Sequence, residues 1–272
     1  MSSITPPDIA KAMKSMRWPV ASSLMKKWVD GGAFTLSDEI KLGSVAPLSL
    51  TSTQFDDTTV KMSWLLKFQR AKTAHAQVIG KALNEKALLV LKSRLSNAGW
   101  KSGAFTLGNS KMDARALEGL CQTNFVPLGS LSDTIDEFYG AIGKGLMKVA
   151  VVGKVAIGTN KRHVFVVDKL GVYLRDTYDF NDDGVLSQPL GVWSKDRCLS
   201  KTEMANFYSD KLSRLNPVTW LVSRLVPPPY PGFEAVDNRS VRAWRESTGK
   251  GGDYVIYSDV TWVDSPVTHV AL

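Results

Sequence analysis

Residues 147–158 read MKVAVVGKVAIG, and residues 163–167 read HVFVV. Both segments are rich in β-branched residues and are bounded by glycine or polar residues, a pattern that predicts β-strands. Residues 158–161 predict the turn between them. A second tight turn is expected at residues 168–171, which would return the chain through residues 172–175 as a hairpin. We therefore expect an antiparallel sheet in this part of the chain.

Helical patterns dominate on either side of this sheet. From Ala71 to Ser96, apolar residues recur at intervals of three and four, which predicts one long helix with a basic opposite face. Ser200 and Glu203 form a capping box that predicts a helix ending near Leu215. The buried stripe expected on that helix consists of Met204, Phe207, Tyr208 and Leu212. Shorter helices are expected at residues 6–16, 20–28, 113–122, 133–142 and 238–245, and a strand at residues 254–257.

The expected fold class is α+β, with a basic, helical N-terminal half and a mixed C-terminal half whose antiparallel sheet carries an acidic loop. A chain of 272 residues with 44% hydrophobic content can bury a sizeable core. Residues 33–60 are rich in Ser and Thr and are expected to form loops with one or two short strands. We predict a small N-terminal helical region at residues 1–60 and a main α+β domain at residues 61–272, with a site within residues 160–200.

The net charge of +8 is concentrated in the first half of the chain. Residues 61–101 contain nine basic residues and one acidic residue, Glu85. This excess favours a phosphate-bearing partner or an anionic membrane surface, and the alternative interpretation is the solvated face of a long helix. No zinc-finger, RNP-type aromatic or helix-turn-helix signature accompanies the basic residues, so a nucleic-acid partner is not expected.

The chain carries no sequence signal for export. Cys121 and Cys198 have neither disulfide-framework nor zinc-site spacing, so we expect two buried thiols in a protein made in a reducing compartment. The N-terminus lacks a charged segment followed by an apolar one, and no run approaches the roughly 18 apolar residues of a membrane span. Neither a signal peptide nor a transmembrane segment is expected, which predicts a cytoplasmic location in the producing cell.

Residues 175–184 read RDTYDFNDDG and bring four carboxylates, a phenol and an amide into ten positions. Clustered carboxylates can hold Mg²⁺, and a metal ion can activate water for hydrolysis of a pyrophosphate ester. Asp176 and Asp179 are the candidate metal ligands or proton acceptors. In the expected hairpin His163 faces Asp176 or Thr177, where its imidazole would act as an acid or base near neutral pH.

Two other interpretations apply to this stretch. Residues 179–184 match the first half of an EF-hand loop, but Leu190 occupies the twelfth position, where a bidentate Glu is required. An incomplete Ca²⁺ site is therefore the alternative metal site. The other interpretation is a polar turn leaving a strand, with Tyr178 in the core.

The pattern Asp176-x-Tyr178-Asp179-Phe180-Asn181 resembles the signature of the colicin M family of bacteriocins. Members cleave the peptidoglycan precursor lipid II between its undecaprenyl chain and its pyrophosphate, with a divalent cation, in the periplasm of the target cell. The resemblance implies catalytic roles for Asp176, Tyr178 and Asp179 and a substrate-binding role for Asn181.

The chain departs from that family pattern in one respect. The family motif continues into a His-Arg pair, whereas no histidine follows here within residues 182–193. His163 is the candidate replacement for the missing histidine, with Arg175 or Arg197 supplying the positive charge. Arg242 belongs to a further set of cations expected to suit a pyrophosphate, together with Arg239, Arg245 and Lys250.

Over its full length the chain is also similar to an uncharacterised proteobacterial family found in gene neighbourhoods of type VI-like secretion. That association implies no function by itself, but it would explain how a toxin without a signal peptide is loaded from the cytoplasm and delivered into the periplasm of a neighbouring cell, with an immunity protein and the secretion machinery as partners. The expected function is therefore a toxin that hydrolyses a lipid-linked pyrophosphate. The alternative is a non-enzymatic secretion adaptor or binding protein whose acidic loop is structural or binds calcium.

Overall fold

The computed structural model describes residues 4–130, 132–158, 162–181, 188–215 and 227–272. Its helices, its large mixed sheet and a small antiparallel sheet confirm the α+β class. The chain forms two compact units, each assembled from three separate segments. The first unit comprises Met1–Thr35, Ser132–Ala141 and Asp179–Asp253, and the second comprises Leu36–Leu131, Ile142–Tyr178 and Tyr254–Leu272. These units follow a different division from the expected one at residue 60.

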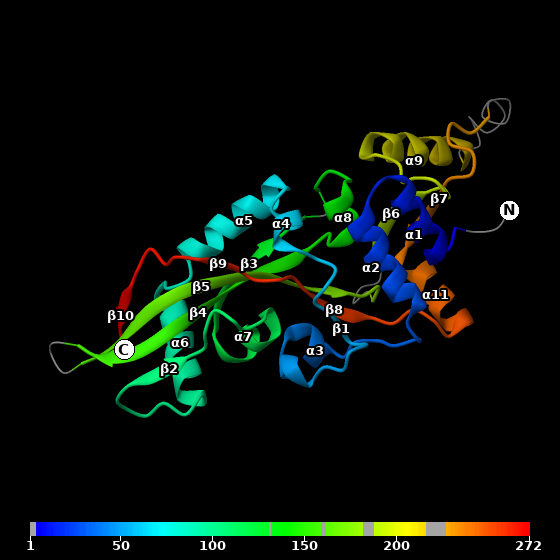
Figure 1. Cartoon of the computed structure of the whole chain (residues 1–272). Coiled ribbons are helices and arrows are strands. Elements are labelled where there is room, and N and C mark those ends of the chain that lie inside the picture. Colours follow the sequence, from blue (N-terminus) through cyan, green and yellow to red (C-terminus); the bar gives the residue numbers. More distant parts are fainter. Residues whose placement is uncertain (1–3, 131, 159–161, 182–187, 216–226) are drawn as a thin grey trace. The chain divides into compact units, whose positions relative to one another are not determined.

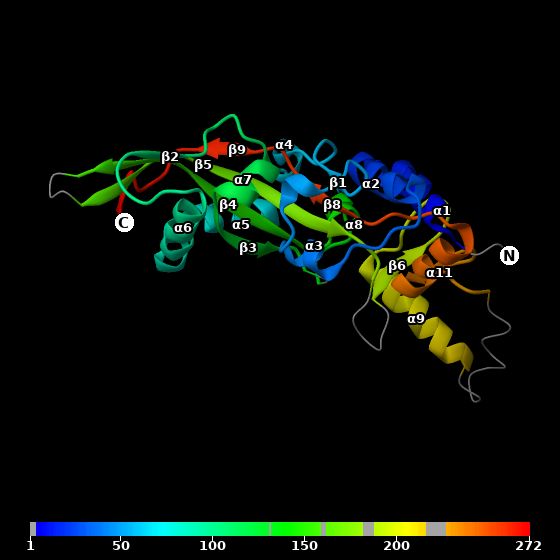
Figure 2. The same cartoon turned by 90° about the horizontal axis from the view of Figure 1, so that it is seen from below.

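The second unit is built on an eight-stranded sheet centred on two long strands, β4 (Gly145–Ile157) and β5 (His163–Tyr178). These two strands run side by side in both views (Figure 1 and Figure 2). The strand order is β1-β8-β5-β4-β2, with β3 also beside β4 and with β9 and β10 also beside β5. Only β1 and β8 pair in parallel among the described strands. The remaining strands of the sheet are β1 (Phe55–Asp56), β2 (Phe105–Leu107), β3 (Gln122–Leu128), β8 (Tyr254–Tyr257), β9 (Thr261–Val263) and β10 (His269–Ala271).

The hairpin expected within residues 163–175 is wrong, because β5 is one uninterrupted strand. Its partner is β4, and the pairing shifts where Val152 faces Lys169 but Gly153 faces Val167. Asp168 is the extra residue of this β-bulge, so the polar Asp-Lys pair lies in a bulge and not in a turn. Gly153 permits the close approach there, because a Cβ atom at this position would lie 2.1 Å from the carbonyl oxygen of Val166.

The long helix expected from Ala71 to Ser96 is also wrong, because two helices occupy this region. They are α5 (Gln69–Gly80) and α6 (Glu85–Asn97). The side chain of Asn84 accepts a hydrogen bond from the backbone N–H of Ala87, which caps the start of α6 and fixes the break. Both helices pack against β3. The other helices of this unit are α3 (Asp38–Leu42), the 3₁₀ helix η1 (Pro47–Ser49), α4 (Met62–Leu65) and α7 (Ala114–Leu120).

The first unit is mostly helical, and the helices expected at its N-terminus are confirmed as α1 (Pro6–Ser15) and α2 (Pro19–Asp30). Arg17 joins them in the left-handed conformation, with φ 60°. The Trp18 N–H donates to the carbonyl oxygen of Met13 at 2.9 Å, a pattern found where helices end in a left-handed residue. The unit also contains α8 (Glu137–Ala141), α11 (Asn238–Thr248) and the paired strands β6 (Pro189–Trp193) and β7 (Glu234–Asp237).

Helix α9 (Lys201–Leu215) confirms the capping box but not the buried stripe. Glu203 Oε2 accepts the Ser200 N–H at 2.7 Å, and Ser200 Oγ accepts the Glu203 N–H at 3.3 Å. No residue of α9 is buried, and Leu212 is 68% exposed. The periodicity correctly predicts a helix with one apolar side, but it does not predict whether another element covers that side.

Candidate functional site

A group of buried polar side chains lies on one face of the sheet in the second unit. Register places Lys148 of β4 opposite Tyr173 of β5, and Arg175 of β5 opposite Tyr257 of β8. Side chains at directly opposite positions share a face of the sheet. Glu118 reaches this group from α7, which contacts β5. We call these five residues the Glu118 cluster, and each of them is at most 8% exposed.

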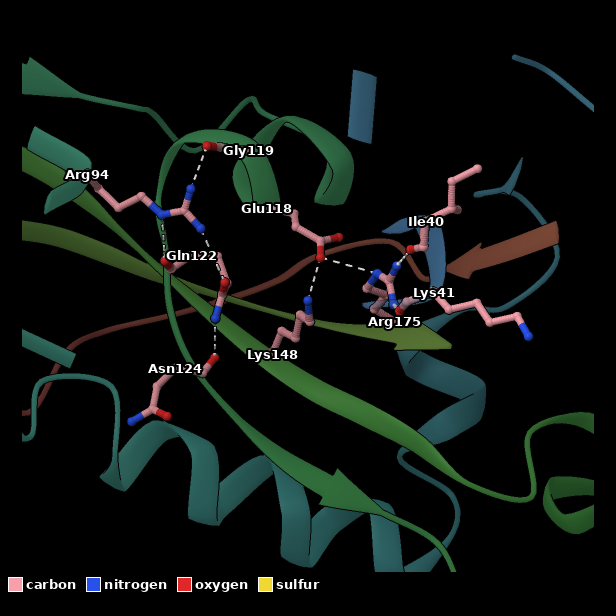
Figure 3. Close-up of polar contacts among 9 residues, drawn as sticks. All are labelled: Ile40, Lys41, Arg94, Glu118, Gly119, Gln122, Asn124, Lys148 and Arg175. Atoms are coloured by element: carbon pink, nitrogen blue, oxygen red, sulfur yellow. Dashed lines mark hydrogen bonds and ion pairs between the residues drawn. The ribbon is translucent and has the colours of Figure 1, made fainter. Parts of the chain in front are cut away.

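Glu118 is the acceptor at the centre of the cluster (Figure 3). Its Oε1 accepts a hydrogen bond from Lys148 Nζ and lies 3.2 Å from Arg175 Nε. The two Nη atoms of Arg175 donate to the backbone carbonyl oxygens of Ile40 and Lys41 at the end of α3. Arg175 thus joins Glu118 to the last turn of a helix, where a cation is also favoured by the helix dipole.

A second guanidinium group is fixed near the cluster in the same way. Arg94 of α6 donates from Nη1 to the carbonyl oxygen of Gly119 at 2.8 Å and from Nε to that of Gln122 at 3.1 Å. Figure 3 shows Arg94 and Arg175 on opposite sides of Glu118. Because backbone carbonyls hold both groups, their positive charges have defined positions.

Burial shifts the ionisation of the cluster. The pKa of Lys148 is lowered chiefly because burial disfavours its charged form, while the neighbouring Glu118 carboxylate opposes this effect. The nearby charges of Arg175 and Arg94 lower the Lys148 pKa further. Burial and then the charge of Glu118 raise the pKa values of Tyr173 and Tyr257, so both phenols are neutral near pH 7.

Hydrogen bonding in the cluster is incomplete. Glu118 Oε2, Tyr173 Oη and Arg175 Nε are buried atoms with no hydrogen-bond partner. They make up half of the six such side-chain atoms in the part of the chain that the structure describes. Arg175 Nε lies within ion-pair distance of Glu118 but is not aligned for a hydrogen bond. Buried polar atoms in folded proteins are nearly always paired, so this concentration makes the cluster a candidate site.

A cavity of about 580 Å³ lies beside the cluster, and we call it the Glu118 pocket. Its lining carries four basic side chains and a single carboxylate, that of Glu118. The basic side chains are those of Lys41, Arg94, Lys148 and Arg175, and the apolar part of the lining includes Leu42, Val45, Phe125 and Leu146. The pocket therefore combines a net positive charge with apolar walls.

The residues of the acidic stretch are divided between the two units. Asp176 and Tyr178 end β5 in the second unit, whereas Asp179 and Asn181 belong to the first unit. Asp176 is 9% exposed, and the ring of Tyr178 stacks on Tyr254 with a centroid distance of 5.4 Å. Burial and then the charge of Asp176 raise the pKa of Tyr178, so its phenol stays protonated at neutral pH. The arrangement of Tyr178 matches the core interpretation of this residue.

Asn181 takes part in a closed network within the first unit, which we call the Asp253 cluster. Asp253 Oδ1 accepts hydrogen bonds from Trp28 Nε1 and Arg245 Nη1, each at 2.9 Å, and Oδ2 accepts one from Asn181 Nδ2 at 2.7 Å. Arg245 Nη2 donates to Asn181 Oδ1 at 2.9 Å and closes the ring. Asp253 and Trp28 are fully buried. These contacts occupy the Asn181 amide, so the structure gives Asn181 an anchoring role.

His163 does not lie beside Asp176, and the expectation that it does is wrong. His163 begins β5 and Asp176 lies thirteen positions further along the same strand, so the two are separated by about 40 Å. His163 Nε2 instead accepts the Gly103 N–H at 3.1 Å, and its ring packs edge-on against Trp100. Because β5 continues through residues 168–171, His163 cannot replace the histidine of the colicin M pattern.

The two other predicted arginines make contacts within the first unit. Arg197 forms a two-point ion pair with Glu203, at 2.8 and 3.0 Å. Arg242 Nη1 donates to the carbonyl oxygen of Phe180 at 2.9 Å. Of the predicted binding residues, Arg175 alone lines the Glu118 pocket.

The predicted metal ligands do not form a cluster in the described residues. No group of three or more His, Cys, Asp or Glu side chains is placed to hold a metal ion there, and Asp176 and Asp179 belong to different units. Asp182, Asp183 and Gly184 of the EF-hand-like pattern lie outside the described residues. Binding of Mg²⁺ or Ca²⁺ by the acidic stretch therefore stays a prediction.

Sequence reasoning missed Glu118 and Lys148, although each leaves a signal. Lys148 is one of the two charged residues of the largely apolar strand β4, and six of its neighbours in that strand, at positions 147 and 149–153, are buried. Glu118 stands on the buried side of α7, together with Ala114 and Leu117. A charged residue inside an apolar stripe is costly unless it is paired, so such positions indicate a buried polar cluster.

The fold and the pocket define an α+β protein with a cation-lined cavity on its main sheet. Residues 5–271 match a family described as a family of unknown function (DUF6402), and the chain belongs to that family. No curated protein and no solved structure matches the chain. Among the described helices, none is both long enough and apolar enough to cross a membrane.

Proposed function

We propose that this chain is a binding protein that takes up a multiply charged anion, such as a phosphate or pyrophosphate group, in the Glu118 pocket. The observation that supports this proposal is the lining of the pocket, which sets four basic side chains against one carboxylate. Concave sites lined by charge of one sign concentrate ligands of the opposite sign. The apolar residues of the lining suit a ligand with an apolar part next to its charged group.

The basic side chains have different tasks in this proposal. Arg94 and Arg175 are held by backbone carbonyls and act as fixed positive charges. Lys148, whose ammonium group carries three N–H donors, is the side chain expected to contact the anion directly. An anion near Lys148 would favour its charged form and offset the lowering of its pKa by burial. Binding is therefore expected to weaken as the pH rises through the lowered pKa of Lys148.

The pocket supports binding better than hydrolysis. A hydrolase needs a base that can reach the attacking water. Glu118 is the one carboxylate of the lining, and its Oε1 already faces Lys148 and Arg175. We therefore favour the binding protein over the enzyme. A lipid-linked pyrophosphate, as implied by the resemblance to colicin M, belongs to the ligand class that we propose.

Antibacterial hydrolysis at Asp176 and Asp179 stays a separate prediction. It is tested by directing the wild type and Asp179→Ala to the periplasm of a susceptible bacterium, with equal abundance and folding of both. Lysis by the wild type alone would support a catalytic role for the acidic stretch, whereas equal toxicity of both would contradict it.

Binding is tested by isothermal titration of the purified chain with inorganic pyrophosphate. Lys148→Met is expected to abolish the heat of binding, and Lys41→Met, at the less buried rim, is expected to weaken binding. Lys72→Met is the matched control, because Lys72 is exposed on α5, does not line the pocket and carries the same charge. The proposal is wrong if the wild type does not bind, or if Lys72→Met weakens binding as much as Lys148→Met.

A further inference from the structure

We infer that the mouth of the Glu118 pocket docks on an anionic lipid bilayer, and this inference rests on the proposed function. Three large apolar side chains that line the pocket or adjoin a lining residue are exposed. Leu42 is 82% exposed, Leu48 is 63% exposed and Phe125 is 51% exposed. They belong to the end of α3, to η1 and to β3.

These three side chains come from two separate parts of the sequence. Leu42 and Phe125 line the same pocket, and Leu48 directly follows Pro47, which also lines it. A single exposed apolar residue needs no explanation, because much of any protein surface is apolar. Two of them in the lining of one cation-lined cavity, with a third next to a lining residue in the sequence, suit a binding surface. We call Leu42, Leu48 and Phe125 the apolar rim.

The backbone next to Leu42 is held in place by the site itself. Arg175 binds the carbonyl oxygens of Ile40 and Lys41, which directly precede Leu42. Gly43 follows with φ 77°, a left-handed conformation that glycine adopts without strain. A Cβ atom at Gly43 would lie 3.6 Å from Glu118 Oε1, so the rim passes close over the centre of the cluster.

The positive charge of the pocket favours an anionic bilayer as the partner. A molecule that meets cations inside the pocket and apolar side chains at its mouth must be amphiphilic, with an anionic head and an apolar tail. Lipids of an anionic bilayer have this chemistry, and basic residues near the surface add attraction to it. Lys41 and Arg94 are such residues in the lining of the pocket itself.

The test is cosedimentation of the full chain with vesicles. One set contains equal parts of phosphatidylglycerol and phosphatidylcholine, and the other contains phosphatidylcholine alone. The wild type is expected to bind the anionic vesicles only, and less at high salt. The double variant Leu42→Ser/Phe125→Ser is expected to bind at least about tenfold more weakly, because two apolar side chains no longer enter the headgroup region.

Leu89→Ser is the matched control. Leu89 is 70% exposed on α6 but does not line the pocket, so its loss is expected to leave vesicle binding unchanged. The inference is overturned if the wild type does not bind anionic vesicles, or if the rim variant binds them as well as the wild type. It is also overturned if the wild type forms a dimer that the rim variant does not form, since a second copy would then cover the rim.

Pyrophosphate titration separates this inference from the proposed function. The rim variant keeps all four basic residues of the pocket, so it is expected to bind pyrophosphate like the wild type. Loss of vesicle binding together with retained pyrophosphate binding supports both conclusions. A wild type that binds pyrophosphate but not vesicles refutes the docking surface alone, whereas one that does not bind pyrophosphate refutes the proposed function.

Discussion

The substitution Asp253→Asn is expected to destabilise the first unit by about 3–5 kcal/mol, the usual cost of removing one partner of a buried ion pair. Asp253 is fully buried, and the Arg245 side chain paired with it is 8% exposed. An asparagine keeps the shape but removes the negative charge that Arg245 requires. It also turns an NH₂ group toward donors, since Asp253 receives its hydrogen bonds from the side chains of Trp28, Arg245 and Asn181.

The assay is urea unfolding followed by tryptophan fluorescence. Two of the eight tryptophans lie at this cluster, because Trp28 contacts Asp253 directly and the ring centroid of Trp244 lies 5.9 Å from that of Trp28, so unfolding of this region changes part of the signal. The control is the double variant Asp253→Leu/Arg245→Met, which removes both charges and is expected to lose less stability than Asp253→Asn. A loss of less than about 1 kcal/mol for Asp253→Asn would refute the view that this cluster anchors the unit.

Three further predictions concern single residues. Arg17→Gly is expected to raise the free energy of unfolding by about 1 kcal/mol, because Arg17 adopts φ 60° at a position that favours glycine; a decrease would contradict this. Burial raises the pKa of Cys121 and of Cys198 to about 12, so neither thiol is expected to react with Ellman's reagent at pH 8 until urea unfolds the chain, and rapid reaction of the native protein would be the contrary result. Hydrogen bonds from Arg197 and Ser200 lower the pKa of Glu203 from 4.5 to about 2. The contribution of Glu203 to the free energy of unfolding is therefore present above pH 4.5 and disappears as the pH falls toward 2. Because the ion pair of Glu203 with Arg197 is partly exposed, Glu203→Gln is expected to reduce stability at pH 7 by no more than about 1 kcal/mol. In a plot of stability against pH, the variant should lose less stability than the wild type between pH 4.5 and pH 2. An unchanged loss of stability over that range would contradict this prediction.

Local patterns predicted the elements whose signals lie within a few residues. Helix α11 ends at Thr248, and Gly249 follows in the left-handed conformation, as the glycine-rich sequence there indicates. The strand at residues 254–257 is also confirmed. The prediction failed at Asp168 because a polar residue between two apolar runs has the same local appearance in a turn and in a β-bulge. Only the partner strand decides between them, and the register of β4 against β5 is set over long range.

The candidate site was missed for a related reason. The acidic stretch is prominent because its polar residues are adjacent in the sequence, whereas Glu118, Lys148 and Arg175 are brought together by one helix and two strands. Their proximity depends on the pairing of β4 with β5, which the incorrect hairpin prediction left out. Arg175 was recognised only because it adjoins the acidic stretch.

The division of each unit into three segments has a consequence for the growing chain during translation. The first unit needs residues up to Asp253, and the second needs β8, β9 and β10 between Tyr254 and Leu272. Dividing the chain at any one position between residues 36 and 253 therefore separates segments that belong to the same unit. Because the ribosome releases the chain from its N-terminus, β4 and β5 emerge well before the C-terminal strands that complete their sheet. Nascent chains stalled before residue 254 should accordingly bind general chaperones. The chain should become resistant to proteolysis only after the final strands have left the ribosome.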